Sequence, residues 1–148
     1  MVKQQPRLFG ELILGLWHEN PIIRLRAADA SEKASRHRPE LLQPFKAELV
    51  GLLAETAEQE LRWHLAQIVP RLKLTPNERS RVVSVLRDYL NDRSSIVKTF
   101  AMQALADLAI ADAALWPATK ALLEELTRIG TPAMRARGRK LLARSPER

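Results

Sequence analysis

The sequence has no cysteine, only five glycines among its 148 residues, and few aromatic side chains. Without cysteine there is no disulfide framework, no zinc site with thiolate ligands and no thiol nucleophile. Five glycines leave nothing from which to build a glycine-rich phosphate cradle, and the chain has no P-loop, GxGxxG or GxSxG motif. These absences argue against an enzyme that works through any of those devices.

Valine, isoleucine and threonine are also scarce, with 20 residues in all. Because strands favour β-branched and aromatic side chains, neither a β-sandwich nor a parallel sheet is expected. Leucine, alanine, arginine, glutamate and lysine instead supply 80 of the 148 residues, which favours an all-helical protein. With 46% hydrophobic residues, the chain has enough apolar surface to bury a sizeable core, so we expect one folded domain over residues 1–148.

Long apolar runs are missing as well, and none approaches the roughly 18 residues that a membrane span needs. The apolar stretch at residues 8–17 is interrupted by Glu11 and leads to His18-Glu19-Asn20-Pro21, which is unlike a signal-peptide cleavage site. We therefore expect a cytoplasmic protein that does not bind membranes.

Apolar residues recur every three or four positions along the whole chain, which predicts a series of amphipathic helices. Caps agree with this pattern: Asn20 precedes Pro21, Thr75 is followed three residues later by Glu78, and Gly130-Thr131-Pro132 separates two apolar stripes. Pro44 is expected to kink the third helix or to mark its true start. The expected helices are residues 7–17, 21–37, 40–56, 58–73, 76–91, 94–110, 113–129 and 132–143.

The even-numbered helices of this series share a short pattern. An aliphatic residue is followed by a cation, and the cations are 38, 36 and 37 residues apart. The four pairs are Ile23-Arg24, Leu61-Arg62, Val97-Lys98 and Met134-Arg135, and the residues three positions after the cations are Ala27, Leu65, Ala101 and Gly138. A fixed period near 37 residues with helix–turn–helix content is typical of an α-solenoid.

This pattern resembles the HEAT-repeat family, in which the second helix of a repeat opens with a polar cap, an aliphatic–Arg/Lys pair and then a small residue. Residues 20–28, 92–101 and 131–138 match it, whereas the second copy departs from it at Leu65. The resemblance covers nearly the whole chain. It implies a right-handed α-α superhelix (solenoid) of about four HEAT-like helix pairs, with repeats at residues 7–38, 39–74, 75–111 and 112–145 and a concave face lined by the even-numbered helices.

The same resemblance implies a non-catalytic scaffold that binds another macromolecule, in the first place a protein, through the concave face. Nucleic-acid backbone binding through the basic C-terminal helix is the first alternative. A HEAT-like DNA glycosylase is a weaker one, because no acid-bearing, aromatic-lined cleft can be assigned. Self-association through the weakly polar first helix, residues 8–17, is a further possibility for a short array.

Basic residues are concentrated near the C-terminus. The formal net charge is +7, and residues 131–148 hold six cations against the single acid Glu147, so this segment carries +5 and the rest of the chain +2. On the last helix the apolar residues share one side. Arg135 and Arg139 then lie along one edge, and Arg137, Lys140 and Arg144 lie along the other. These five residues are candidates for contact with nucleic acid or an acidic protein, although cations near a helix C-terminus also suit its dipole in plain solvent.

The repeated cations Arg24, Arg62, Lys98 and Arg135 would form a ladder along one face. They either provide a basic track or, as the resemblance implies, bond a carboxylate or carbonyl of a neighbouring repeat. We favour the structural role for the first three, which lie inside the array, whereas Arg135 belongs to the basic last helix.

Of the three tryptophans, Trp63 lies off the apolar stripe of its helix, so we expect it to be partly exposed and able to anchor a peptide or stack on a base. Trp17 and Trp116 are expected to fill gaps between layers. The histidines His18, His37 and His64 share no spacing, and no HExxH motif occurs. No catalytic residue, metal site or cofactor is therefore expected.

Overall fold

The structure, a computed structural model, describes residues 6–144. Within that range the chain is all-helical, which confirms the expectation of an all-α protein, and no residue is in a strand. The helices form two compact units, Met1–Leu74 and Thr75–Arg148. Residues 1–5 and 145–148 lie outside the described residues, and with them Arg148 and the expected end of the fourth repeat.

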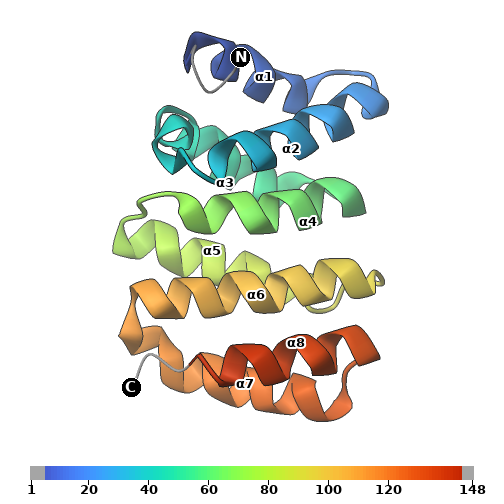
Figure 1. Ribbon diagram of the computed structural model, residues 1–148, viewed down its shortest axis with the longest axis vertical. Coiled ribbons are helices and arrows are strands. Elements are labelled where there is room, and N and C mark those ends of the chain that lie inside the picture. Colours follow the sequence, from blue (N-terminus) through green and yellow to red (C-terminus); the bar gives the residue numbers. More distant parts are fainter. Residues whose placement is uncertain (1–5, 145–148) are drawn as a thin grey trace. The chain divides into compact units, whose positions relative to one another are not determined.

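The N-terminal unit contains four α-helices interspersed with three short 3-10 segments. In chain order they are α1 (Pro6–Leu14), a 3-10 turn (Gly15–Trp17), α2 (Pro21–Ser35), a 3-10 segment (Pro39–Phe45), α3 (Lys46–Glu55), α4 (Gln59–Ile68) and a last 3-10 turn (Val69–Arg71). Helices α2 and α4 pack side by side, and α3 lies behind them (Figure 1). The core between them is rich in leucine, with Leu42, Leu49, Leu53, Leu61 and Leu65 at no more than 1% exposure, and α2 contributes Ala27 and Ala28.

The C-terminal unit contains α5 (Pro76–Tyr89), α6 (Ser95–Ala111), a 3-10 turn (Ala113–Leu115), α7 (Trp116–Ile129) and α8 (Pro132–Leu142). The long helix α6 packs against the other three, and α6 and α8 lie side by side in the layer nearer the viewer (Figure 1). Their shared core is a cluster of buried side chains that includes Met102, Trp116, Leu123, Met134 and Leu141.

The caps expected from the sequence are confirmed. The Asn20 side chain accepts a hydrogen bond from the Ile22 amide at 2.9 Å. Thr75 and Glu78 form a reciprocal capping box, in which the Glu78 amide donates to Thr75 Oγ1 and the Thr75 amide donates to Glu78 Oε1. These bonds satisfy amide groups that have no partner inside the helix, so each fixes where its helix begins.

Helix ends differ from the expected ones where proline removes a backbone donor. The segment expected as one helix at 40–56 is 3-10 through Phe45, with Pro44 inside it, and α3 begins only at Lys46. The helix expected at 58–73 ends at Ile68 and continues as a 3-10 turn that contains Pro70. In both places the missing N–H interrupts the α-helical hydrogen bonding. Among the described helices, none combines the length and the apolar character that crossing a bilayer would require.

Candidate functional site

Helix α8 is the most strongly basic element of the described chain. Thr131 caps its N-terminus by accepting from the Met134 amide at 3.3 Å, and Pro132 occupies the first turn. The underside of the helix, Met134, Gly138 and Leu141, is buried against α6 and α7. The apolar stripe therefore holds α8 in place, and its cations are left on the outer surface.

Gly138 permits the close approach of α8 to α7. A Cβ atom at this position would lie 1.9 Å from Thr127 Oγ1 and 3.0 Å from Thr127 Cβ. Thr127 cannot simply turn away without loss, because its hydroxyl donates to the Leu123 carbonyl at 2.6 Å. The small residue of the repeat pattern is thus a packing requirement in this copy.

Two arginines on the α6 side of α8 are held by side chains of α6. Arg137 Nη1 donates to Gln103 Oε1 at 2.8 Å, and its guanidinium lies 5.8 Å from the centre of the Phe100 ring. Arg144 Nη2 lies 3.3 Å from Asp107 Oδ1, which also accepts from Gln103 Nε2 at 3.0 Å. The groups around Arg137 orient its guanidinium but are uncharged, so its positive charge is not cancelled. Only Arg144 has an acid beside it.

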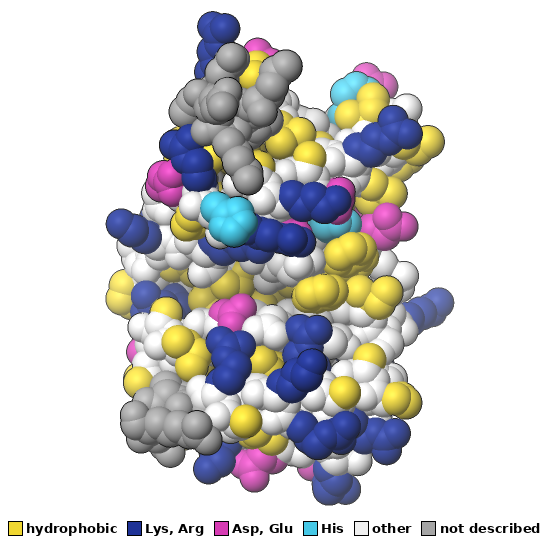
Figure 2. Space-filling view, in the orientation of Figure 1, with side chains coloured by type: hydrophobic (Ala, Val, Ile, Leu, Met, Phe, Trp, Pro, Cys, Tyr) yellow, Lys and Arg dark blue, Asp and Glu magenta, His cyan; other side chains and the backbone are white. Residues whose placement is uncertain are grey.

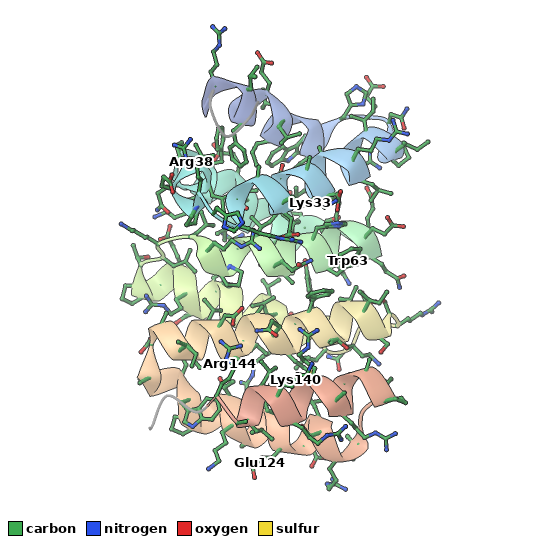
Figure 3. All side chains as sticks on the ribbon, viewed as in Figure 1. Lys33, Arg38, Trp63, Glu124, Lys140 and Arg144 are labelled. Atoms are coloured by element: carbon green, nitrogen blue, oxygen red, sulfur yellow. The ribbon has the colours of Figure 1, made fainter. Side chains whose placement is uncertain are left out.

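The other three candidate cations are free of such contacts. Arg135, Arg139 and Lys140 are exposed, and within residues 6–144 their side chains form no hydrogen bond or ion pair. Figure 3 shows Lys140 and Arg144 on the side of α8 that faces α6. On the face drawn in Figure 2, Lys and Arg side chains outnumber Asp and Glu over α6 and α8. The surface formed by α8 and the outer side of α6, here called the α6–α8 face, is therefore strongly electropositive.

The repeated cations do not all share one environment. Arg24 donates to the carbonyls of His18 and Glu19 and pairs with Glu58 at 2.7 Å, so it links α2 to the residue that precedes α4. Arg62 Nε donates to the Thr56 carbonyl at 2.9 Å, within its own repeat. Lys98 is half-buried, with no side-chain partner among the described residues. Arg135 is exposed on α8.

One of the three tryptophans, Trp17, is not where the sequence predicts it. Trp116 is buried in the core of the C-terminal unit, and Trp63 is half-buried on α4, stacked on His64 with ring centres 3.8 Å apart. Trp17 does not fill a gap between layers as expected, because it is 44% exposed. The 3-10 turn that ends the first helical segment directs Leu16 into the core and leaves Trp17 at the surface.

Sequence reasoning anticipated only the part within residues 8–17 of an apolar surface at the corner where α1 meets α2. Leu14, Trp17, Ile22 and Ile23 are exposed there, with 38–67% of each side chain accessible. The periodicity treats such residues as core, and nothing local to the sequence says that no helix covers them. We call these four residues the α1–α2 corner.

It also missed a buried carboxylate in the N-terminal unit. Glu32 is only 3% exposed, and its carboxylate forms two ion pairs. One is with Arg36, the C-cap residue of α2, and the other is with Arg71 Nη2 at 2.6 Å, from the 3-10 turn that follows α4. Burial by itself raises the pKa of the Glu32 carboxyl, but the bonds from Arg36 and Arg71 outweigh it and hold that pKa below its usual value. The pair of Glu32 with Arg36, four residues later, can be expected from helical spacing, whereas Arg71 lies 39 residues away in the sequence and has no local signal.

Each unit has a surface hollow, and the one in the C-terminal unit, lined by Arg87, Leu122 and Leu126 among others, has a volume of about 390 Å³. One pocket of about 180 Å³ is lined by Pro39, Glu40, Gln43, Arg71 and Lys73, and most of its polar groups already bond one another or Glu32. Within the described residues no three His, Asp or Glu side chains come together in a way that could hold a metal ion. The α6–α8 face is thus the surface whose chemistry most clearly calls for a partner. The chain matches no protein-family model, no curated protein and no solved structure.

Proposed function

We propose that this chain is a non-catalytic HEAT-like repeat module whose α6–α8 face binds the phosphate backbone of a nucleic acid. The observation that carries the proposal is the charge of residues 132–144, which include five cations and no acid. Asp107 is the one carboxylate bonded to any of the five among the described residues. When lysine and arginine side chains neutralise phosphates, the counterions condensed on the nucleic acid are released. This release is the main source of affinity for a nucleic-acid backbone.

The composition of the outer surface of α8 favours a nucleic acid over a protein for this face. Protein interfaces are centred on buried aromatic or large aliphatic side chains. The exposed side of α8 and its C-cap offer the small side chains Ala133, Ala136 and Ala143 between the cations, and Pro132 in the first turn. A partner that binds here gains its free energy from charge, and a regular polyanion supplies that charge along the whole helix.

The test is fluorescence anisotropy with a labelled oligonucleotide and two matched variants. The first variant, Arg135→Glu/Arg139→Glu/Lys140→Glu, reverses the three cations of α8 that have no partner. The second, Arg81→Glu/Arg87→Glu/Lys120→Glu, reverses three exposed cations on α5 and α7 and changes the net charge equally. We expect the first to weaken binding at least about tenfold and the second to leave it within about twofold. Equal losses would mean that net charge alone attracts the oligonucleotide, and the proposal would fail.

The solenoid is part of the same proposal. In it the two units continue one right-handed superhelix of four helix pairs, with α2, α4, α6 and α8 in one layer. Support comes from inside each unit, where Arg24 pairs with Glu58 and Ser95 Oγ lies 2.7 Å from Thr131 Oγ1, both links running from one even-numbered helix to the start of the next. A period near 37 residues in both units supports it as well.

Because the chain has no native cysteine, this arrangement can be measured with two introduced labels. Spin labels at Lys33→Cys on α2 and Lys140→Cys on α8 are separated by three helix-to-helix steps of about 8–10 Å in a continuous array. We expect one narrow distance distribution centred at about 24–30 Å. A broad distribution would show that the units move independently and would contradict the single superhelix.

A protein partner, the first expectation from the sequence, is favoured by a different observation, the α1–α2 corner. Exposed apolar clusters of this kind commonly mark protein contacts. A second copy of the chain is the partner that can be tested first, by sedimentation velocity over a range of concentrations. Concentration-dependent dimers that disappear in Trp17→Ser/Ile22→Ser would support it, and a monomer at about 100 μM would exclude the second copy.

A further inference from the structure

The cations of α8 form two rows on opposite sides of an exposed strip, here called the crest, which is made of Ala136 and Ala143. At about 100° per residue, Ala136 and Ala143 point outward, opposite the buried Met134, Gly138 and Leu141. Arg135 and Arg139 lie one turn apart on the edge away from α6. Lys140 lies on the edge toward α6, Arg144 follows on the same side just past the end of α8, and Arg137 is lower on that side and bonded to α6.

Burial agrees with this assignment. Both alanines, Arg135, Arg139, Lys140 and Arg144 are exposed, Arg137 is half-buried, and the three residues of the underside are buried. The crest is low because its side chains end at Cβ, whereas the flanking cations extend well beyond it. The outer surface of α8 is therefore a narrow, low alanine crest with a positive row on each side.

We propose that α8 enters the major groove of a double-stranded nucleic acid, so that its two rows contact the phosphates of the two opposing strands. This inference rests on the proposed function and adds the geometry of the ligand. A helix with its side chains is about 10–12 Å across, and the major groove of B-form DNA is about 12 Å wide. Two rows of cations on opposite edges match a ligand that presents phosphates on both sides.

A single strand fits this surface less well. Proteins that hold single strands offer aromatic rings on which successive bases stack. The exposed side of α8 has no aromatic residue, and the nearest ring on α6, Phe100, already lies beneath the Arg137 guanidinium. One row of cations would remain without phosphates if a single backbone followed the other.

The crest also determines how the bases are read. Alanine methyl groups neither donate nor accept hydrogen bonds, so toward base edges they offer only apolar contact, for example with a thymine methyl group. Contacts to phosphates position a protein on a duplex without specifying sequence. Binding is therefore expected to depend on duplex form much more than on base sequence.

Arg137 has a positioning role in this geometry. The Phe100 ring and the Gln103 amide hold its guanidinium at the base of the α6-side row without cancelling its charge. Arg144 is held as well, but Asp107 offsets part of its charge. The two rows therefore present two exposed, unpaired cations away from α6 and one toward it, reinforced there by Arg137.

The experiment compares a duplex of about 25 base pairs with a single strand of the same length, using wild type and the crest variant Ala136→Phe. The variant leaves the net charge unchanged. Its bulky ring stands where the crest would meet the groove, and it also offers a surface on which unpaired bases can stack. We expect wild type to prefer the duplex at least about tenfold at equal salt, and Ala136→Phe to weaken duplex binding while keeping single-strand binding. Row variants Arg135→Gln/Arg139→Gln and Lys140→Gln/Arg144→Gln should each weaken duplex binding.

Failure of this inference is distinct from failure of the proposed function. Equal affinity of wild type for duplex and single strand, or duplex binding that Ala136→Phe leaves unchanged, would overturn groove entry while leaving backbone binding in place. If wild type binds neither oligonucleotide at about 50 mM salt, both the inference and the proposed function are wrong. Circular dichroism of Ala136→Phe confirms that the exposed substitution leaves the helices intact.

Discussion

The same glycine-to-alanine substitution is expected to have opposite effects at two helical positions. Gly51 lies in α3 and Gly138 in α8, both inside their helices. An added Cβ at Gly51 has no neighbour within 4 Å outside its own helical turn, whereas at Gly138 it would lie 1.9 Å from Thr127 Oγ1. The gain in helix propensity is common to both sites, so their difference isolates the packing of α8 on α7.

The magnitudes follow from these distances. Replacing glycine by alanine inside a helix stabilises it by about 0.5–1 kcal/mol when nothing obstructs the methyl group. Inserting a methyl group into a tightly packed contact costs about 1–3 kcal/mol. We therefore expect Gly51→Ala to raise the free energy of unfolding by about 0.5–1 kcal/mol and Gly138→Ala to lower it by about 1–2 kcal/mol.

Urea denaturation followed by circular dichroism at 222 nm measures both changes. If the two units unfold in separate transitions, each variant is compared with wild type in the transition of its own unit. In a Thr127→Ala background the clashing hydroxyl is gone, so the penalty of Gly138→Ala should fall. Stabilisation of equal size at both positions would refute the close α7–α8 contact, and with it the fixed placement of the α6–α8 face.

Three further substitutions probe other parts of the structure. Thr75→Ala removes the capping box of α5 and should lower the free energy of unfolding by about 1 kcal/mol, with Thr75→Ser retaining most of it. Arg24→Met keeps the apolar stem but loses the bonds to two carbonyls and Glu58, and a fall of about 1–3 kcal/mol is expected in thermal or urea melts. Because the folded-state pKa of Glu32 is lowered, its network stabilises the protein at pH values above the ordinary carboxyl value of 4.5 and loses this effect as the pH falls below it. The stability difference between wild type and Glu32→Gln should accordingly be full at pH 7 and shrink toward pH 3, and a constant difference across that range would contradict the ion-pair assignment.

Local features of the fold could be predicted from the sequence because their causes are local. The caps at Asn20 and Thr75 depend on residues two or three positions away, and the boundary at Gly130-Thr131-Pro132 falls where α7 ends and α8 begins. Pro70 lies inside the helix expected at residues 58–73, and its missing N–H is the local signal for the 3-10 turn at Val69–Arg71. Amphipathic periodicity alone does not distinguish an α-helix from a 3-10 extension.

The site could be predicted in part. The two edges of α8 follow from helical geometry, and in the structure four of their cations are exposed whereas Arg137 is half-buried. The contact of Arg137 with Gln103 spans 34 residues, and that of Arg71 with Glu32 spans 39, so neither has a local signal. Exposure of Ile22 and Ile23 likewise depends on which helices cover the corner of α1 and α2, which periodicity cannot report.

The most direct test of backbone binding by α8 is the salt dependence of duplex affinity. For each phosphate contact, the slope of log K against log salt concentration contributes about −0.9 on B-form DNA. Wild type is compared with Arg135→Glu/Arg139→Glu/Lys140→Glu and with the matched α5–α7 variant. Loss of three phosphate contacts predicts a slope shallower by about 2–3 in the α8 variant and unchanged in the control. Identical slopes in all three proteins would show that α8 does not bind the phosphates.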